Sequence, residues 1–422
     1  MAESVISQVN AENYFFTPPV HNFLVEALHW DWLSLTLKAY LLAAGFVAYS
    51  LFPLCLNVFL AWFNDYLIDA ELNFVTIVFI TFFTGVAAFL LPPVPGLTVY
   101  IFGGLMLSAT CPDGFWPGAG WNIAMGWFLK LFACAIQQVV IGGVLGKSLW
   151  VRQTVGVHKL AVRCIEGVLR EPGLTLGKVA ILCGGPDWPT SVLAGILGLS
   201  LWQCEVGTLP IILFIVPCSL SGSFYLKKGT SNVWDRSADL MILTSVIVNM
   251  LLWALVAWAM QHHLETHYTE LTRPLPQNVD LEWLDYRSAE LKKETQVSWC
   301  RLPLLVRGSL GLGAAIHVGV GHAVWWGYNY LVHHFEVSDD IHTLKSWYGD
   351  EGVVTFLGVI VLATYAISWL AYIQYFVWVR STTKRQLAAK SLELALAEPA
   401  WKEDWLKMAR AWTPPVKEHV TD

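Results

Sequence analysis

Two stretches rich in proline and glycine contain the residues of this sequence best able to build a site. The stretch 92–95 reads PPVP and is followed by GGLMLS at 103–108, and the stretch 186–189 reads PDWP and is followed by GILGLS at 195–200. Proline removes a backbone N–H and glycine permits tight turns, so each stretch should interrupt a helix. Inside a membrane, broken backbone is tolerated only where protein buries it or water reaches it. The pair predicts a transport path where two half-helices meet, with a chance likeness of common residues as the alternative.

A lysine inside an apolar stretch supplies the charge for this path. Lys130 lies in WFLKLF at 127–132, with Gln137 and Gln138 following about two turns on. A lone charge in a span costs about 2.5–3.5 kcal/mol, so Lys130 should find water or a partner, for which Asp187 is the candidate. We expect a groove in which Lys130 attracts a phosphate, unless its side chain simply extends to a lipid headgroup. The predicted groove comprises Pro92, Pro95, Gly96, Gly103, Gly104, Lys130, Gln137, Gln138, Pro186, Asp187, Pro189 and Gly195.

Other chemistry is not expected. His263 and His267 have a spacing that places two imidazoles on one helix face, but no third ligand follows, so no metal and no cofactor are predicted. GGVLGKS at 142–148 resembles a phosphate loop, yet Ile141 stands where that motif needs glycine, so no nucleotide is expected to bind. The glycines around His317 favour close helix packing. No enzyme activity is predicted.

Composition assigns the chain to a broad class. Of its 422 residues, 55% are hydrophobic and only 14% are charged, whereas a soluble domain carries about 25% charge. Such a sequence cannot cover its apolar surface in water, which excludes a cytosolic globular protein and a disordered one. Lys and Arg number 26 against 32 Asp and Glu, so no basic field favours nucleic acid. The prediction is an all-α polytopic membrane protein.

Runs free of Asp, Glu, Lys and Arg locate about eight hydrophobic elements, at 39–64, 72–112, 131–146, 188–204, 206–226, 240–264, 308–335 and 352–379. The run 72–112 is too long for one span and contains the first break, so it should form one span and a broken element. The expected organisation is a polar N-terminal segment (1–32), a first span and loop (33–71), a membrane core (72–229), additional transmembrane helices (230–380) and an amphipathic tail (381–422).

The flanking segments suggest an orientation. Basic residues in 147–178 and in the tail predict that both are cytoplasmic, although Lys227, Lys228 and Arg236 in a loop on the other side do not fit this rule. Apolar stripes in 151–169 and 401–412 could lie on an anionic leaflet or pack on the protein's own spans. The segment 265–300 is expected to be a short polar excursion. Segment 1–32 has no Lys or Arg, so no cleavable signal is predicted.

The two broken segments resemble a known family. LPPVPGLTVY at 91–100 with Gly103 and Gly104, and PDWP at 186–189 continuing to SFYLKKG at 223–229, resemble the VTT domain of the DedA-like, SNARE-associated Golgi protein group over about residues 72–229. The resemblance implies two opposed re-entrant hairpins, followed here by a C-terminal helical extension, and movement of phospholipid between leaflets. Family members commonly carry an acidic residue near the first hairpin and an Arg before the second. This chain has neither, so proton-coupled transport of an anionic headgroup is not implied.

The predicted function is scramblase-like or transporter-like movement of membrane phospholipids. One alternative is a structural or accessory subunit of a larger membrane complex, which the 22 Trp would suit, since aromatic residues are enriched at interfaces. Another is an ion-coupled carrier of small solutes, for which Asp187 would be the carboxylate. The expected location is an endomembrane of the endoplasmic reticulum or Golgi type, rather than a plastid or mitochondrial membrane.

Overall fold

The computed structural model describes residues 30–92, 94–295, 297–337, 341–349 and 352–413, with residues 17, 19, 20, 23, 26 and 27. Most of the predicted segment 1–32, Pro93 and the side chain of Asp187 lie outside the described residues. The chain forms two compact units. Unit 1 comprises 1–48, 293–332 and 354–387, and unit 2 comprises 49–292, 333–353 and 388–422.

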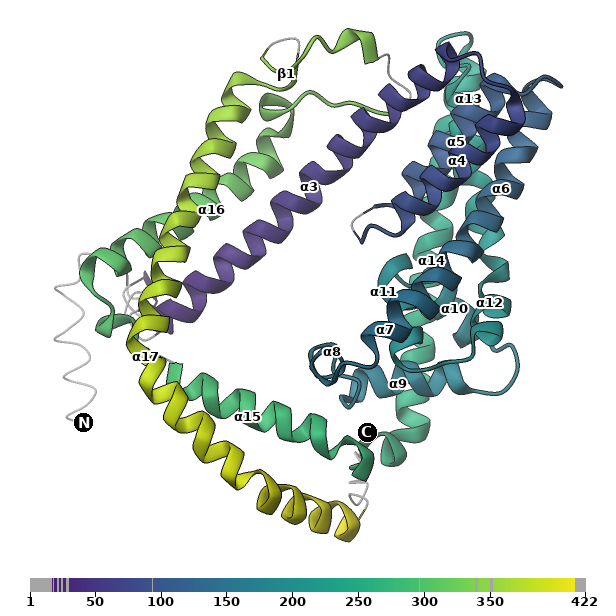
Figure 1. The fold of residues 1–422 in the computed structure, drawn as a ribbon. Coiled ribbons are helices and arrows are strands. Elements are labelled where there is room, and N and C mark those ends of the chain that lie inside the picture. The colour runs from purple at the N-terminus through teal and green to yellow at the C-terminus, as the bar shows by residue number, and fades with distance from the viewer. Residues whose placement is uncertain are drawn as a thin grey trace. The chain divides into compact units, whose positions relative to one another are not determined.

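The chain is an all-α, multi-pass membrane protein, as predicted. Among the described residues, six helical segments are long and apolar enough to cross a membrane: Trp32–Asp69 (α3), Phe115–Leu145 (α6, η2 and α7), Leu201–Tyr225 (α12, η3 and α13), Asn232–Thr272 (α14), Leu304–Leu331 (α16) and Phe356–Ala411 (α17). The segments Phe115–Leu145, Leu201–Tyr225 and Asn232–Thr272 lie side by side in Figure 1. The strands in the described part of the chain are β1 (Ser346–Tyr348) and β2 (Gly352–Val354), which pair with each other.

Unit 2 contains two pairs of short helices, and each pair is separated by a proline break. The first pair is α4 (Phe74–Phe89) and α5 (Gly96–Thr110), and the second is α10 (Leu176–Gly184) and α11 (Asp187–Ile196). Their 16, 15, 9 and 10 residues give lengths of at most about 24 Å at 1.5 Å per residue, less than the roughly 30 Å of hydrocarbon in a bilayer. Both predicted interruptions are therefore present. In Figure 1 the two pairs lie toward opposite ends of the unit.

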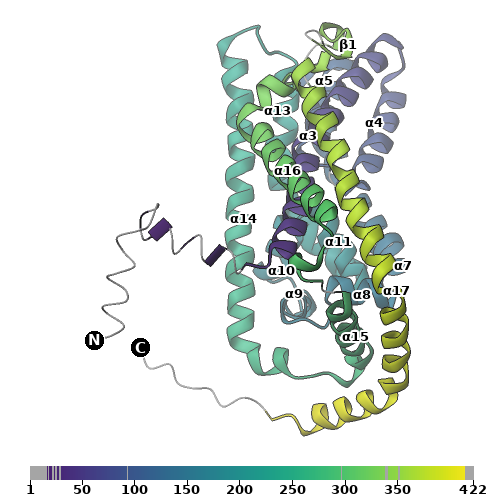
Figure 2. The same cartoon turned by 90° about the vertical axis from the view of Figure 1, so that its left-hand side faces the viewer.

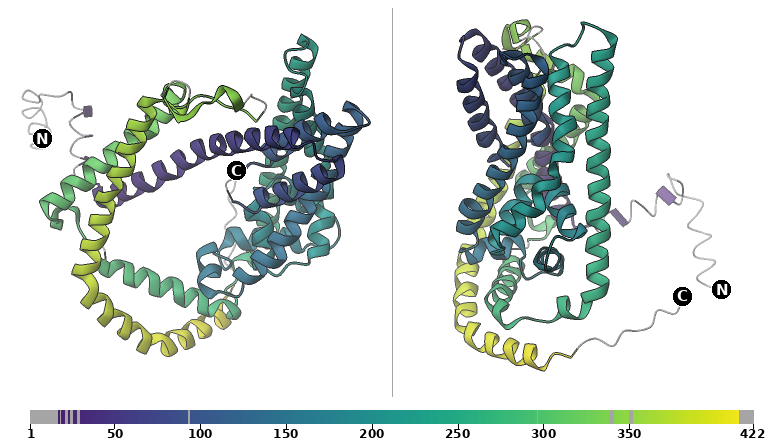
Figure 3. Two further views of the ribbon diagram at one scale, coloured as in Figure 1. Left: turned by 45° about the horizontal axis from the view of Figure 1, so that its top comes forward. Right: turned by 90° about the vertical axis from the view of Figure 1, so that its right-hand side faces the viewer.

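Three longer segments pack around these pairs. The α6 helix (Phe115–Ile136) continues into a π-helical turn, η2 (Gln137–Gly142), and the short α7 (Gly143–Leu145). The η2 turn packs against α11, whereas α6 packs against α4 and α5. The α13 helix (Ile212–Tyr225) packs against α5 and α14 (Asn232–Thr272). Figures 2 and 3 show α14 as a long helix along one side of unit 2.

The first amphipathic stretch packs on the protein's own helices. It forms α8 (Leu149–Val155) and α9 (Leu160–Arg170), and the turn between them contains Gly156, whose φ of 75° is readily adopted only by glycine. The apolar face of α9 is buried where α9 packs against α14 and α10: Cys164, Val168 and Leu169. Of the two alternatives for this stretch, the structure therefore favours packing on the chain's own spans.

The segment predicted to be a polar excursion is mainly a helix, α15 (Val279–Thr295). Leu281 is 2% exposed and packs in a cluster with Val192 of α11. The second amphipathic stretch lies on α15, because the Trp401 ring is 5.3 Å from that of Tyr286 and Lys402 Nζ is 2.7 Å from Asp280 Oδ1. The α17 helix (Phe356–Ala411) also runs without a break across the predicted boundary at 380. The part of α17 that follows its membrane span is thus stabilised by apolar and charged contacts with α15.

Unit 1 contains a tightly packed aromatic cluster. His317 of α16 (Leu304–Leu331) is fully buried, with its ring 4.1 Å from Tyr40 and 4.5 Å from Tyr365. A Cβ at Gly313 would collide with the Tyr40 hydroxyl, so the glycine permits the contact. Figure 2 shows α16 beside α17. The close packing expected of the glycines around His317 is thus present at Gly313, whereas a Cβ at Gly308 or Gly319 would meet no atom within 4 Å.

A partly buried carboxylate, that of Asp285, fixes α15 to α8 and to the loop between α8 and α9. Asp285 Oδ2 lies 2.8 Å from His158 Nε2 and also contacts Lys159 Nζ, and Gln153 Nε2 donates to Asp285 Oδ1 at 3.1 Å. Partial burial alone would raise the pKa of Asp285, but hydrogen bonds from Lys159, His158 and Gln153 outweigh it and lower this pKa below its ordinary 3.8.

Asp285→Asn is expected to loosen α15 at pH 7. Because the pKa of Asp285 is lowered on folding, its stabilising contribution is complete above about 3.8, the ordinary pKa of the side chain, and is lost as the pH falls through the folded value. Amide hydrogen exchange in 279–295 should be faster in the variant at pH 7, and the difference should shrink toward pH 3. The exposed Glu294→Gln on the same helix is the control. Equal exchange in both variants at pH 7 would contradict this anchoring role.

Candidate functional site

The two proline breaks meet at one cavity of about 280 Å³, here called the break cavity. Pro95 and Gly96 reach it from the first break and Pro186 from the second, as the paired motifs predict. The remaining lining residues come from α5, α10, α13, α14 and adjoining turns: Leu97, Tyr100, Cys183, Gly184, Gly185, Ile211, Phe214, Ser245, Val246, Asn249 and Trp253. Segments about 90 residues apart in the sequence therefore form a single site within unit 2.

Helix ends supply backbone hydrogen-bonding groups at this cavity. The α5 helix begins at Gly96 and α11 follows its N-cap, Pro186, while α10 ends at Gly184. Among the described side chains, none caps the N-terminus of α5 or α11. A helix N-terminus has about half a positive charge and free N–H groups, which suit an anionic oxygen such as that of a phosphate.

The α14 helix contributes a polar face that sequence reasoning missed. Ser245, Asn249 and Trp253 recur at intervals of four, so they lie on one face of the helix, and all three line the cavity. This i, i+4, i+8 spacing inside the apolar run 240–264 was the available signal. Of the described lining residues, none is Lys, Arg, Asp, Glu or His, so the cavity offers hydrogen bonds without a full charge.

The two consecutive glutamines support the broken helices instead of lining the cavity. Gln137 Nε2 donates to the Phe89 carbonyl at 2.7 Å, and Phe89 is the last residue of α4. Gln138 Nε2 donates to the Leu199 carbonyl at 2.9 Å, just beyond α11. Both glutamines belong to the π-helical turn, which points one side chain to each hairpin. Each therefore satisfies a carbonyl close to the end of a broken segment.

Lys130 lies near the first break, close to the last residue of α4. Its side chain is 2% exposed, and Nζ is 5.6 Å from the centre of the Phe89 ring. Such burial excludes extension to a headgroup, the alternative considered from sequence. Lys130 interacts electrostatically with Glu205 of α12 (Leu201–Thr208). Because the side chain of Asp187 lies outside the described residues, the structure does not bear on the predicted Lys130–Asp187 pair.

Glu205 is an acidic residue inside a membrane-spanning segment. In the sequence it separates the charge-free runs 188–204 and 206–226, where a position at the membrane interface is the simplest expectation. The structure places it, half-buried, within the apolar segment Leu201–Tyr225. A single carboxylate between two long apolar runs was the signal that could have indicated a membrane position. Lys130 and Glu205 are both absent from the residues that line the break cavity.

The remaining predicted groove residues have different surroundings. Pro92 and Pro189 are exposed beside the breaks. The glycines Gly103, Gly104 and Gly195 lie where helices touch: a Cβ on them would collide with Asn122, the Ser219 carbonyl and the Gln138 carbonyl, respectively. These glycines bring the helices around the cavity into contact, and none of the three lines it.

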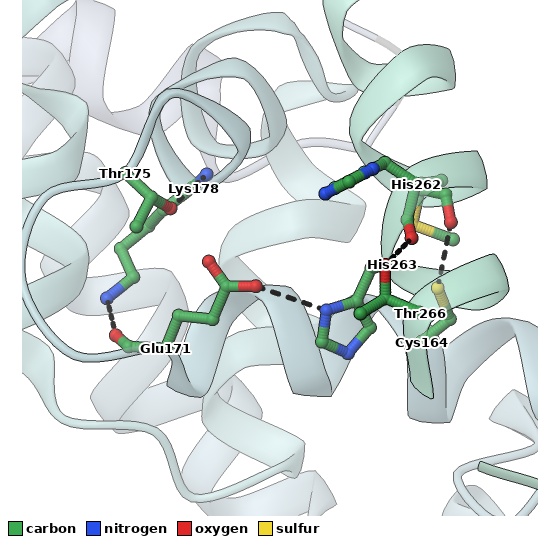
Figure 4. Close-up of polar contacts among 8 residues, drawn as sticks. Cys164, Glu171, Thr175, Lys178, His262, His263 and Thr266 are labelled. Carbon is green, nitrogen blue, oxygen red and sulfur yellow. Dashed lines mark hydrogen bonds and ion pairs between the residues drawn. The ribbon is translucent and has the colours of Figure 1, made fainter. Parts of the chain in front are cut away.

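A second buried lysine anchors the outer end of the second hairpin. Lys178 is 1% exposed, and its Nζ donates to the carbonyls of Glu171 at 2.6 Å and Gly173 at 2.8 Å. The Glu171 carboxylate lies 3.1 Å from His263 Nδ1 on α14 (Figure 4). The His263 ring stacks on His267 at 4.4 Å, and the described residues contain no group of three potential metal ligands. This network fixes α10 to α14.

Comparisons with family models, with curated proteins and with solved structures find no match. The function is therefore inferred from the residues and their geometry.

Gln137→Leu is expected to destabilise the first break. The substitution leaves the buried Phe89 carbonyl without its donor, which costs about 1–3 kcal/mol. The melting temperature in detergent should fall, whereas Gln203→Leu at an exposed position of α12 should leave it unchanged. Equal melting of the two variants would show that the Gln137 bond does not hold the break.

Proposed function

We propose that this protein moves phospholipids between the two leaflets of a membrane without an energy source. The headgroup passes through the break cavity while the acyl chains stay in the lipid, and the chain is a VTT-like, DedA-like protein. The single observation that supports this proposal best is the shared cavity: two interrupted, proline-capped helices from separate parts of unit 2 line it together. An endomembrane is the proposed location.

The chemistry of the cavity suits a headgroup in transit. A phospholipid crosses slowly because its polar headgroup must leave water, and burying unpaired polar groups costs several kcal/mol. The backbone N–H groups of Gly96 and Leu97, at the start of α5, can bind phosphate oxygens, and Ser245 and Asn249 add side-chain partners. The volume of about 280 Å³ is small beside typical pockets for drug-sized ligands, which favours entry of the headgroup alone.

The interior of unit 2 also has polar atoms that water or a headgroup could satisfy. Among the described residues, Gln137 Oε1, Glu205 Oε1 and Ser219 Oγ are buried without a hydrogen-bond partner. Because unsatisfied polar atoms are costly in a membrane, they favour a hydrated interior over a dry one.

Lys130 has a positioning role in this proposal. Its ammonium lies 5.6 Å from the centre of the ring of Phe89, the last residue of α4, and Gln137 donates to the Phe89 carbonyl. Together they keep α4 and the first break in place. The carrier alternative would use Asp187, whose side chain lies outside the described residues. Of the described residues that line the cavity, none is a carboxylate.

Reconstitution into liposomes with a fluorescent phospholipid tests the proposal. The protein should accelerate exchange between leaflets well beyond the rate in empty vesicles. Val246→Trp should reduce exchange at least about fivefold, because Val246 lines the cavity and an indole would fill it. Ile247→Trp is the matched control, since Ile247 is exposed on the same helix and does not line the cavity.

Two outcomes would contradict the proposal. Wild-type exchange no faster than that of empty vesicles would eliminate lipid movement. Equal exchange by Val246→Trp and Ile247→Trp would remove the break cavity from the path. A stoichiometric membrane partner that co-purifies in detergent, together with no exchange, would favour the accessory-subunit alternative.

A further inference from the structure

A second cavity lies next to the first in unit 2. This cavity, here called the Glu336 cavity, has a volume of about 220 Å³, far more than the roughly 30 Å³ of one water molecule in the liquid. It is lined by residues from α3, α5, α13, α14 and the segment after α16: Asn57, Leu97, Thr98, Ile101, Tyr225, Ile242, His334, Glu336 and Val337. Leu97 lines both cavities, so the two adjoin at this residue.

The Glu336 cavity differs from the break cavity because it has full charges of both signs beside it. Glu336 lines it, and Lys228 Nζ lies 3.7 Å from Glu336 Oε2. The same ammonium is 5.2 Å from the centre of the ring of Tyr225, another lining residue. Both contacts place the Lys228 ammonium beside the cavity. One cation and one anion stand together at a site that also offers the hydroxyls of Thr98 and Tyr225.

The ion pair is held in place but is not tightly closed. The side chains of Lys228 and Glu336 are 52% and 38% exposed, and pairs this exposed contribute little to stability, so a ligand can replace either partner at little cost. The segment that carries Glu336 is fixed, since Phe335 and Val337 are each 5% exposed and Asn57 Nδ2 donates to the Phe335 carbonyl at 3.1 Å. The backbone that carries Glu336 is thus held at the cavity independently of the ion pair.

We propose that the Glu336 cavity binds the headgroup of a zwitterionic phospholipid, with the phosphate at Lys228 and the ammonium at Glu336. This inference rests on the proposed function and specifies its substrate class. A zwitterionic headgroup has one charge of each sign, which matches the pair, and it then enters the uncharged break cavity with no net charge. An anionic headgroup such as that of phosphatidylglycerol has no cation for Glu336, whose carboxylate repels the phosphate.

The inference also gives Lys228 a local role. Lys228 belongs to the loop whose basic residues do not fit the positive-inside pattern. A lysine that binds a phosphate contributes to substrate binding wherever its loop lies.

Binding is tested on the purified full-length protein in detergent by calorimetric titration. The probes are phosphocholine, inorganic phosphate, dihexanoyl phosphatidylcholine and dihexanoyl phosphatidylglycerol. We expect the short-chain phosphatidylcholine to bind most tightly, and Glu336→Gln to weaken its binding at least tenfold. The control is Glu393→Gln, which removes the carboxylate of an exposed ion pair with Lys390 on α17 and should bind as the wild type does.

Each other result overturns a stated part of the inference. Inorganic phosphate that binds as tightly as phosphocholine would make the cavity a simple anion site. Phosphocholine that binds while the short-chain lipid does not would make the ligand a free metabolite. No binding of any probe, or equal binding by Glu336→Gln and the wild type with unchanged melting temperatures, would remove the site altogether.

Vesicles separate this inference from the proposed function. Fluorescent phosphatidylcholine should exchange at least about fivefold faster than fluorescent phosphatidylglycerol, and Glu336→Gln should abolish the difference while still exchanging lipid. Exchange at equal rates for both headgroups would overturn the headgroup preference and leave lipid movement intact. No exchange of either lipid would overturn the proposed function, and the titration would still decide whether the cavity binds a headgroup.

Discussion

Peptide groups exposed by a broken helix must find partners when the break lies inside a membrane, and the architecture of unit 2 follows from this constraint. Hydrocarbon offers no hydrogen bonds, so each freed carbonyl or N–H must meet protein, water or a ligand. Gln137 and Gln138 satisfy one carbonyl beside each broken segment, and Lys178 satisfies two carbonyls at the outer end of the second hairpin. Pro95 and Gly96 of the first break and Pro186 of the second line the break cavity.

Close helix contact is the second requirement for such a site. Short half-helices bury little surface, so their positions depend on neighbours that approach closely. Gly104 brings α5 against α13, and Gly195 brings α11 against the π-helical turn that carries both glutamines. The glycines of the repeated motif and the glutamine donors therefore act together: the first set brings the backbones into contact, and the second satisfies the carbonyls that this arrangement leaves near the breaks.

The distribution of charge gives the two cavities different properties. The break cavity offers helix ends, hydroxyl and amide groups, but no full charge among its described lining residues. The Glu336 cavity has a loosely paired carboxylate and ammonium beside it. Lys130 and Glu205 interact electrostatically with each other, away from the residues that line the break cavity, and Lys130 lies beside the end of α4. Charged side chains thus lie at the exposed Glu336 cavity, where the desolvation cost is lower, and in the helices that support the breaks, where Lys130 and Glu205 offset each other's cost.

The sequence alone determined the fold class, most spans and the positions of both breaks, because these depend on local properties: apolar length, proline that cannot donate, and glycine that permits turns. Tertiary structure decided which groups meet. The electrostatic interaction of Lys130 with Glu205, the continuation of α17 past residue 380 and the helical form of α15 all depend on residues far apart in the chain. Hydrophobic periodicity does not predict which distant residues pair, because the packing of whole helices decides which side chains come together. The cavity that joins the breaks was foreseeable as a meeting point, but its polar wall of Ser245 and Asn249 came from the position of α14 beside both hairpins.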